Sequence, residues 1–141
     1  MAVHLIKLAV GCDSAAYLGE RQRFHADRMG LTGVVPGFTR RKPKRAEELI
    51  GSGSLFWVIK RQVRVRQRIL DLVDARDEAG EPYCLMHLHP SLIAVAPQPK
   101  RPFQGWRYLQ PADAPPDLAS GDGGEPLPPG LAEDLRDLGV F

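Results

Sequence analysis

The sequence contains few cysteines and no long hydrophobic run. Cys12 and Cys84 are the only two cysteines in a chain of 141 residues. No apolar segment approaches the roughly 20 residues that a membrane-spanning helix needs. The first ten residues include His4 and Lys7 and lack a signal-peptide cleavage site, so we expect them to form a first strand. These absences predict a cytoplasmic protein with two reduced thiols and no association with membranes.

The sequence also lacks a convincing metal site. Cys84, His87 and His89 form a C-x2-H-x-H pattern. On a strand, alternation places the two histidines on one face and the cysteine on the other. Zinc sites usually show more tightly paired ligand spacing. We therefore expect no metal and no other cofactor.

Motifs of common enzymes are absent as well. There is no Walker loop and no G-x-G-x-x-G fingerprint, and the GSGS sequence lacks the spacing of a G-x-S-x-G nucleophile elbow. A small hydrolase-type enzyme is kept as an alternative, because histidines, a thiol, a hydroxyl and a carboxylate could still meet in space. Such a pocket would have to join His87 or His89 to Ser52, Cys12 or Asp71.

What the chain does contain is an uneven distribution of charge. Hydrophobic residues make up 43% and charged residues 26%, which is ordinary for one globular domain of this length. The net charge is only +2, but residues 38–73 hold ten of the nineteen Lys and Arg residues against three acids. Residues 110–141 hold seven acids and one base. This asymmetry favours a surface for nucleic acid or another anionic ligand.

Hydrophobic periodicity and turn residues predict a single α+β domain over residues 1–110. The fold would be a small, bent, mostly antiparallel sheet or a barrel, with flanking helices. A helix is expected from about Ser14, a plausible N-cap, to Met29, with Gly30 as the residue that ends it. The expected strands are 3–10, a short edge strand or loop at 31–38, 55–60, a segment from 62 onwards, and one or two strands within 83–95. The proline at His89–Pro90 implies an edge, a bulge or a break in that last segment.

The helix over 14–29 is expected to have two sides. Its larger apolar residues lie roughly along one side, and most of its charged residues face water. The first group is Tyr17, Leu18, Phe24 and Met29, and the second is Arg21, Arg23, Asp27 and Arg28.

Residues 111–141 form a separate arm in this interpretation. They are rich in proline, glycine and acids, which is typical of a linker or wrapping segment. A short final helix is expected over 129–138, where leucines are spaced to pack on the body. The acidic arm could shield the basic centre or simply be solvated.

Two groups of cations carry the functional hypothesis. Pro43 keeps the first group on an extended segment, and the second alternates with apolar residues on one face of a strand, about 6.5–7 Å apart. Closely spaced cations neutralise phosphates, and arginine binds them in bidentate geometry. The alternative is a solvated surface that pairs with acids. The candidates are Arg40, Arg41, Lys42, Lys44 and Arg45 in the first group, and Arg64, Arg66 and Arg68 in the second.

Aromatic residues near these cations offer stacking surfaces for bases. Trp57 lies between the two basic groups, and Trp106 follows a proline-rich stretch. Aromatic platforms beside a positive groove hold single-stranded nucleic acid with little sequence preference. Packing in the core is the alternative for both tryptophans, and it is the better interpretation for Phe56, Phe103 and at least one of the two tryptophans.

Three segments resemble a known family. PKRAEELIGSGSLFWVIK, VRQRILDL and FQGWRYLQPADAPPD are similar to an uncharacterised bacterial family of this length, a domain of unknown function found chiefly in alphaproteobacteria. The resemblance implies a single-domain cytoplasmic protein and no particular activity. The element order also resembles PUA-like domains (the ASCH, EVE and YTH groups), a similarity that implies a β-barrel and binding of RNA or modified bases. The Gly-x-Lys-x-x-Glu signature of the ASCH group is not present, and Lys44 to Glu47 echoes it only loosely.

Together these features predict a domain that binds RNA or another polyanion on a basic, aromatic-lined surface. A protein-interaction or structural module is the alternative, and the sequence leaves the oligomeric state open. The predicted site consists of Arg40, Arg41, Lys42, Lys44, Arg45, Trp57, Arg64, Arg66, Arg68 and Trp106.

Overall fold

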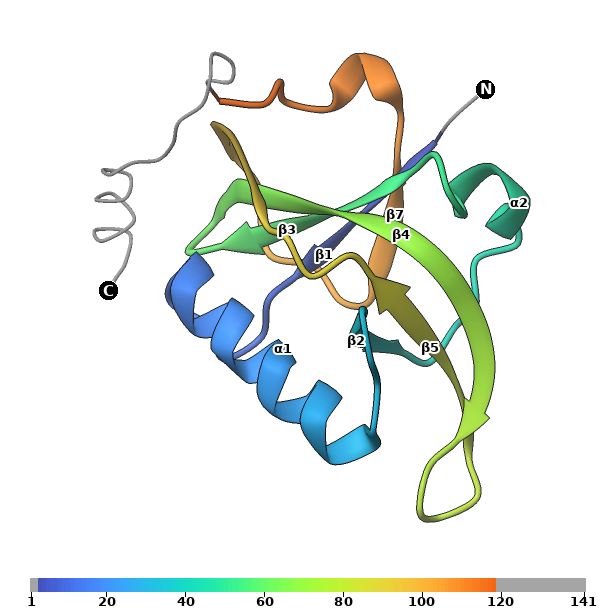
Figure 1. Ribbon diagram of the computed structural model, residues 1–141. Helices are drawn as coiled ribbons and strands as arrows, with labels where there is room; N and C mark the ends of the chain where they lie inside the picture. The colour runs from blue at the N-terminus through green and yellow to red at the C-terminus, as the bar shows by residue number, and fades with distance from the viewer. Residues whose placement is uncertain (1–2, 119–141) are drawn as a thin grey trace.

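The computed structural model describes residues 3–118, which form one seven-stranded, mostly antiparallel sheet with two α-helices (Figure 1). This architecture confirms the predicted α+β class. No helix within 3–118 is long and apolar enough to cross a membrane. In chain order the elements are β1 (His4–Leu8), α1 (Ala15–Met29), β2 (Val35–Thr39), α2 (Ala46–Leu49), β3 (Ser54–Ile59), β4 (Gln62–Arg76), β5 (Pro82–Leu88), β6 (Ile93–Pro99), β7 (Trp106–Leu109) and a 3-10 turn at Pro111–Asp113.

Helix α1 begins and ends where its local signals predict. The Ser14 hydroxyl accepts a hydrogen bond from the backbone N–H of Tyr17, at 3.1 Å, and so satisfies one of the unpaired donors of the first turn. Gly30 ends the helix in the left-handed conformation, with φ of 73°. The buried side differs from the expected one, because Tyr17 and Phe24 are about half exposed. The residues that α1 buries are Leu18, Gly19, Gln22 and Ala26.

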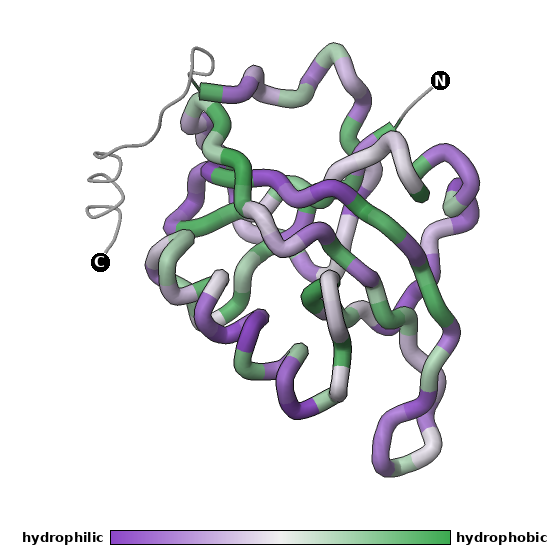
Figure 2. The backbone as a smooth tube through the Cα atoms, viewed as in Figure 1, coloured by the Kyte–Doolittle hydropathy of each residue, from purple (hydrophilic) through white to green (hydrophobic). Residues whose placement is uncertain are grey.

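Strand β4 is the axis of the sheet. Its first half pairs with β3 on one side and β6 on the other, and its second half pairs with β5. Register shifts interrupt all three pairings, which bends the strand. The hydropathy of β4 also differs between its two halves: Figure 2 shows a largely hydrophilic first half and a largely hydrophobic second half. Strands β1 and β3 are parallel, and the other pairings are antiparallel.

The sheet is open across the described residues, so the barrel alternative is wrong. Its order is β2-β5-β4-β3-β1-β7, with β6 beside β4, and no backbone pairing joins the terminal strands β2 and β7. The two ends nevertheless approach each other. The indole Nε1 of Trp106, in β7, donates a hydrogen bond of 2.6 Å to the carbonyl of Arg41, two residues after β2. Side chains therefore connect the two edges where a barrel would have a backbone ladder.

Each face of the sheet contributes to a separate hydrophobic cluster. Leu5 and Trp57 belong to the main core, together with residues of α1, β2 and β5. Ile6 and Phe56 belong to a smaller cluster on the other face, which includes Val95. Alternation along β1 and β3 produces this division. All six residues of β3 are consequently buried.

The first part of the predicted arm contacts the body. The backbone N–H of Leu118 donates to the carbonyl of Ala94 at 2.9 Å, and Asp117 forms an isolated bridge with Val95. Residues 116–118 thus run beside β6. The predicted helix at 129–138 lies outside the described residues.

Candidate binding cleft

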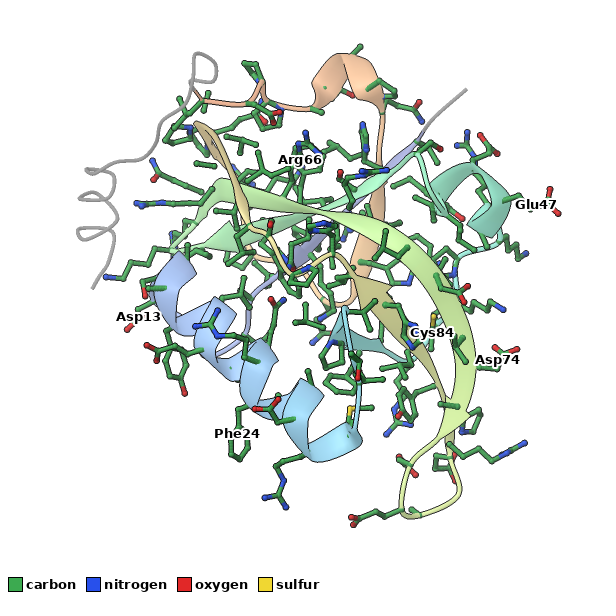
Figure 3. The ribbon with its side chains drawn as sticks, in the orientation of Figure 1. Asp13, Phe24, Glu47, Arg66, Asp74 and Cys84 are labelled. Carbon is green, nitrogen blue, oxygen red and sulfur yellow. The ribbon has the colours of Figure 1, made fainter. Side chains whose placement is uncertain are left out.

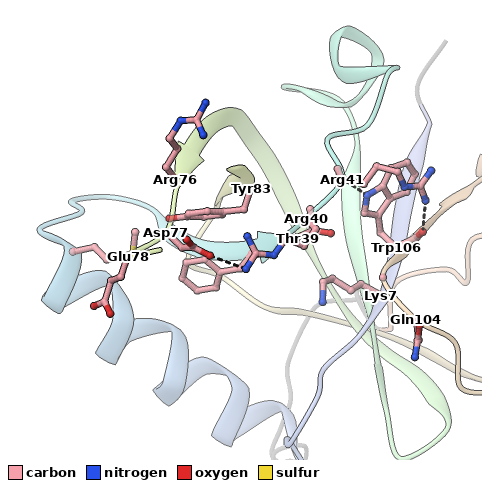
Figure 4. Close-up of a pocket in the computed structure, with 13 residues that line it drawn as sticks. Lys7, Thr39, Arg40, Arg41, Arg76, Asp77, Glu78, Tyr83, Gln104 and Trp106 are labelled. Atoms are coloured by element: carbon pink, nitrogen blue, oxygen red, sulfur yellow. Dashed lines mark hydrogen bonds and ion pairs between the residues drawn. The ribbon is translucent and has the colours of Figure 1, made fainter. Parts of the chain in front are cut away.

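A cleft of about 890 Å³ opens where the two ends of the sheet approach each other (Figure 4). Strand β2 contributes Phe38, β5 contributes Tyr83, and β7 contributes Trp106. Four cationic side chains also line the cleft, and they come from β1, from the segment after β2, and from the end of β4. They are Lys7, Arg40, Arg41 and Arg76.

The cleft has an aromatic wall with an accessible surface. Phe38 is 41% exposed although it belongs to a strand, and its ring lies 6.0 Å from that of Tyr83, centroid to centroid. Tyr83 is half-buried. Both rings therefore keep surface that the core does not enclose. Sequence reasoning missed both residues. Their signal was a Phe and a Tyr on strands that pair with each other at the edge of the sheet.

Trp106 lines the other side of the cleft, where it anchors Arg41. The indole is 3% exposed, and the Arg41 guanidinium lies 4.1 Å from a ring centroid of the indole. Arg41 also donates to the backbone carbonyl of Trp106 at 3.4 Å. This cation–π contact fixes the position of a positive charge at the mouth of the cleft. The structure thus brings two predicted site residues together. Trp106 supports Arg41, and Arg41 is an exposed cation.

The other cations of the first group have acidic partners or face solvent. Ion pairs join Arg40 to Asp77 at 2.7 Å, Lys42 to Asp74 at 3.5 Å, and Arg45 to Glu48 at 2.6 Å. The Arg40 guanidinium and two backbone N–H groups lower the pKa of Asp77. Lys44 is exposed and has no ion pair within 3–118. The first group of cations therefore carries less unpaired positive charge than its composition suggests.

Lys7 is a cation that the sequence interpretation assigned only to a first strand. It is half-buried on the same side of β1 as the main core, and no carboxylate lies within ion-pair distance of it among the described residues. Burial, and secondarily the charge of Arg21, lowers its pKa. An anion in the cleft would offset this unfavourable environment. The signal that could have found it is a single lysine within a mostly apolar strand.

The second group of arginines lies on the opposite face of the sheet. Arg66 pairs in register with Phe56, a member of the smaller cluster, whereas Lys7 faces the main core. All three guanidinium nitrogens of Arg66 have partners: Nε and Nη2 donate to the Asp117 carboxylate at 2.7 and 2.8 Å, and Nη1 donates to Ser54. Figure 3 shows Arg66 beside the segment that follows β7. The two basic groups do not form one surface.

Arg64 and Arg68 are less engaged. Arg64 donates to the side chain of Gln62 at 3.0 Å, and its Nε is buried without a partner within 3–118. Arg68 is exposed and donates to the carbonyl of Gly51 at 3.3 Å. A role of these arginines in binding stays a prediction.

Trp57 is a core residue in this structure. Its side chain is 5% exposed, and Nε1 donates to the Gln67 side chain at 2.9 Å. Gln67 is fully buried and exchanges hydrogen bonds with Gln22 of α1. This network satisfies all the polar atoms of the buried amide pair and joins the helix to the sheet. Stacking of a base on Trp57 would require the core to open.

The residues of the hydrolase alternative do not line the cleft. Ser52 donates to the carbonyl of Glu48, the Asp71 carboxylate accepts from the backbone N–H of Leu72, and His89 Nδ1 accepts from that of Ser91. The two remaining residues of that alternative, His87 and Cys12, do not line the cleft either.

Both cysteines are free thiols and are buried. Burial raises the pKa of Cys12; the charge of Arg21 opposes this shift, and Asp13 adds a smaller rise. Burial likewise raises the pKa of Cys84. Among residues 3–118 no group of three His, Cys, Asp or Glu side chains is arranged to hold a metal ion.

Comparison with known proteins gave one match. Searches of curated proteins and of solved structures returned none. The bacterial origin and the PUA-like similarity therefore stay predictions. A family model described as "Protein of unknown function (DUF1489)" matches residues 5–141, nearly the whole chain, which confirms the predicted membership of an uncharacterised family. The chain belongs to the DUF1489 family.

Proposed function

We propose that the protein binds RNA in the cleft between β2 and β7. The observation that carries the proposal is the combination of an exposed aromatic wall with a half-buried lysine that has no carboxylate partner within residues 3–118. Phosphates would bind to Lys7 and Arg41, and a base would stack on Phe38 beside Tyr83.

Four cations and two carboxylates, Asp77 and Glu78, line the cleft, and Lys7 and Arg41 are the two cations that support an anionic ligand. A half-buried cation loses hydration without gaining an opposite charge, so its burial is unfavourable until an anion arrives. Arg41 adds a second charge whose position is fixed by Trp106. Arg40 is paired with Asp77 and contributes less. Binding should therefore depend on salt, because the phosphates of RNA release counterions when they meet these cations.

The aromatic wall supports a nucleic acid over a simple inorganic anion. The rings of Phe38 and Tyr83 are tilted by 49° and present apolar surface beside the cations. Stacking of a base on such a ring contributes about 1–3 kcal/mol and tolerates every base. A phosphate alone would leave this surface exposed to water.

The test is fluorescence anisotropy with a labelled oligouridylate and oligoadenylate of about ten nucleotides, at salt concentrations from about 50 to about 200 mM. Lys7→Gln and Arg41→Gln should each weaken binding about tenfold and reduce the salt slope by about one. Phe38→Ala should weaken binding about tenfold with no change in the slope.

Lys100→Gln is the matched control, because Lys100 is an exposed lysine that does not line the cleft. It should stay within about twofold of the unmodified protein, since it makes no phosphate contact in the proposed complex. The proposal fails if neither RNA binds at the lowest salt, or if Lys7→Gln and Arg41→Gln bind as tightly as the control.

A further inference from the structure

The exposed face of α1 carries two aromatic residues that lie outside both hydrophobic clusters of residues 3–118. Tyr17 is 49% exposed and Phe24 is 56% exposed. They are seven residues apart, so they lie almost in line along the helix. Figure 3 shows Phe24 projecting away from the body. These two rings give the outer face of α1 apolar surface that is accessible to a ligand.

Charges flank this aromatic row asymmetrically. Helical geometry places Arg21 and Arg28 along the edge of the row that faces His25, and it places Glu20 and Asp27 along the opposite edge. The cationic edge is thus the one nearer β2.

The Arg28 guanidinium lies 5.5 Å from the centroid of the Phe24 ring. Arg21, in contrast, is partly held by a hydrogen bond of 2.7 Å to the carbonyl of Val10. An arginine beside an aromatic ring combines a stacking surface with a phosphate partner.

A chain of rings connects this row to the cleft. The centroid of the His25 ring lies 5.6 Å from that of Phe24 and 5.8 Å from that of Phe38. Phe38 in turn lies 6.0 Å from Tyr83, inside the cleft. Met29, at the end of α1, also lines the cleft. The helix surface and the cleft are therefore continuous.

From this continuity we infer that the ligand is a single-stranded RNA that leaves the cleft and crosses α1, with bases stacked on Phe24 and phosphates at Arg28. This inference rests on the proposed function of the cleft. The RNA must be single-stranded, because only unpaired bases expose faces that can stack on protein side chains. Glu20 and Asp27 keep the phosphates on the edge of the row that faces β2, because their negative charges repel them.

The experiment compares two labelled oligouridylates, one of about four nucleotides, which the cleft alone would hold, and one of about twelve, which reaches α1. The unmodified protein should bind the longer probe at least about tenfold more tightly. The double variant Phe24→Ala/Arg28→Gln should lose about tenfold affinity for the longer probe and stay within about twofold for the shorter one. A duplex RNA of the longer length should compete at least about tenfold less well than the single strand.

Arg23→Gln is the control, since Arg23 is an exposed arginine of α1 outside the row, and it should leave both probes unaffected. Thermal unfolding of each variant checks that the fold is kept, and the exposure of Phe24 predicts that it is. If the double variant binds the longer probe normally while Lys7→Gln weakens both probes, the path across α1 is wrong and the cleft stands. If the double variant weakens both probes equally, the path is also wrong. If neither Lys7→Gln nor Arg41→Gln changes the binding of either probe, the proposed function fails, and this inference fails with it.

Discussion

The segment Arg40–Arg45 and the arginines of β4 look alike in the sequence and differ in the structure. Both are dense in cations, and both were expected to contact phosphates. In the first segment, Arg41 lies on an indole at the mouth of a cleft and has no carboxylate partner within 3–118. In β4, Arg66 has a partner for every guanidinium nitrogen and connects the sheet to the residues that follow β7. The density of charge in a sequence therefore does not reveal whether that charge is available to a ligand.

The largest effect that would test this contrast is on stability. Arg66→Met should lower the free energy of unfolding by about 2 kcal/mol, because it removes charge-assisted hydrogen bonds and leaves the Asp117 carboxylate unpaired. Urea denaturation measures this, and RNA affinity measured in parallel should change less than about twofold. A large loss of affinity with unchanged stability would reverse the roles assigned to the two groups.

The second effect concerns Arg41. Arg41→Met should weaken RNA binding about tenfold, because a phosphate partner is lost. It should lower the free energy of unfolding by less than about 1 kcal/mol, since a cation–π contact at an exposed site contributes about that much. Anisotropy and urea denaturation of the same sample give both values. If Arg41→Met destabilised the protein as strongly as Arg66→Met, the distinction between the two groups would be lost.

A third, smaller effect is the pH dependence of the Arg66–Asp117 pair. Hydrogen bonds from Arg66 lower the pKa of Asp117 below its ordinary value of 3.8. The pair therefore contributes stability above that ordinary value, and the contribution is lost as the pH falls through the lower pKa of the folded state.

Asp117→Asn should consequently be less stable than the unmodified protein by about 1 kcal/mol at neutral pH, a figure limited by the exposure of the carboxylate. The difference should shrink on acidification from about pH 5 to about pH 2. Urea denaturation across this range checks the trend. A difference that does not depend on pH would mean that the carboxylate is not paired.

The smallest effect is expected at Arg68. It is exposed, and its contact within 3–118 is a long hydrogen bond to Gly51. Arg68→Gln should change the free energy of unfolding by less than about 0.5 kcal/mol and RNA affinity by less than about twofold. A clear loss of affinity would instead restore the β4 arginines to the binding surface.

Local signals predicted the elements of this fold well. Helix α1 begins after Ser14 and ends before Gly30, because a cap and a left-handed glycine act within one turn of the helix. The chain breaks between β5 and β6 at His89–Pro90, which is one of the outcomes, with an edge or a bulge, that the proline predicted. The turn between β3 and β4 had no such signal, since Lys60 and Arg61 adopt φ of 52° and 66° without a glycine or asparagine.

The candidate site was less predictable. Arg41 and Trp106 were predicted members and do lie together, but Lys7, Phe38 and Tyr83 were missed. Each missed residue is ordinary within its own strand. They form a site only because β1, β2 and β5 bring them to one cleft. Local sequence patterns do not predict the order of strands in a sheet.

The sequence by itself determined the α+β class, the bounds of α1, the alternation of β4 and the family, since these depend on caps, period-two patterning and similarity along the chain. The tertiary structure alone decided which face each cationic group occupies, and that Trp57 belongs to the core. The reason is geometric. Register, bulges and strand order decide which distant residues become neighbours, and the availability of a charge depends on those neighbours.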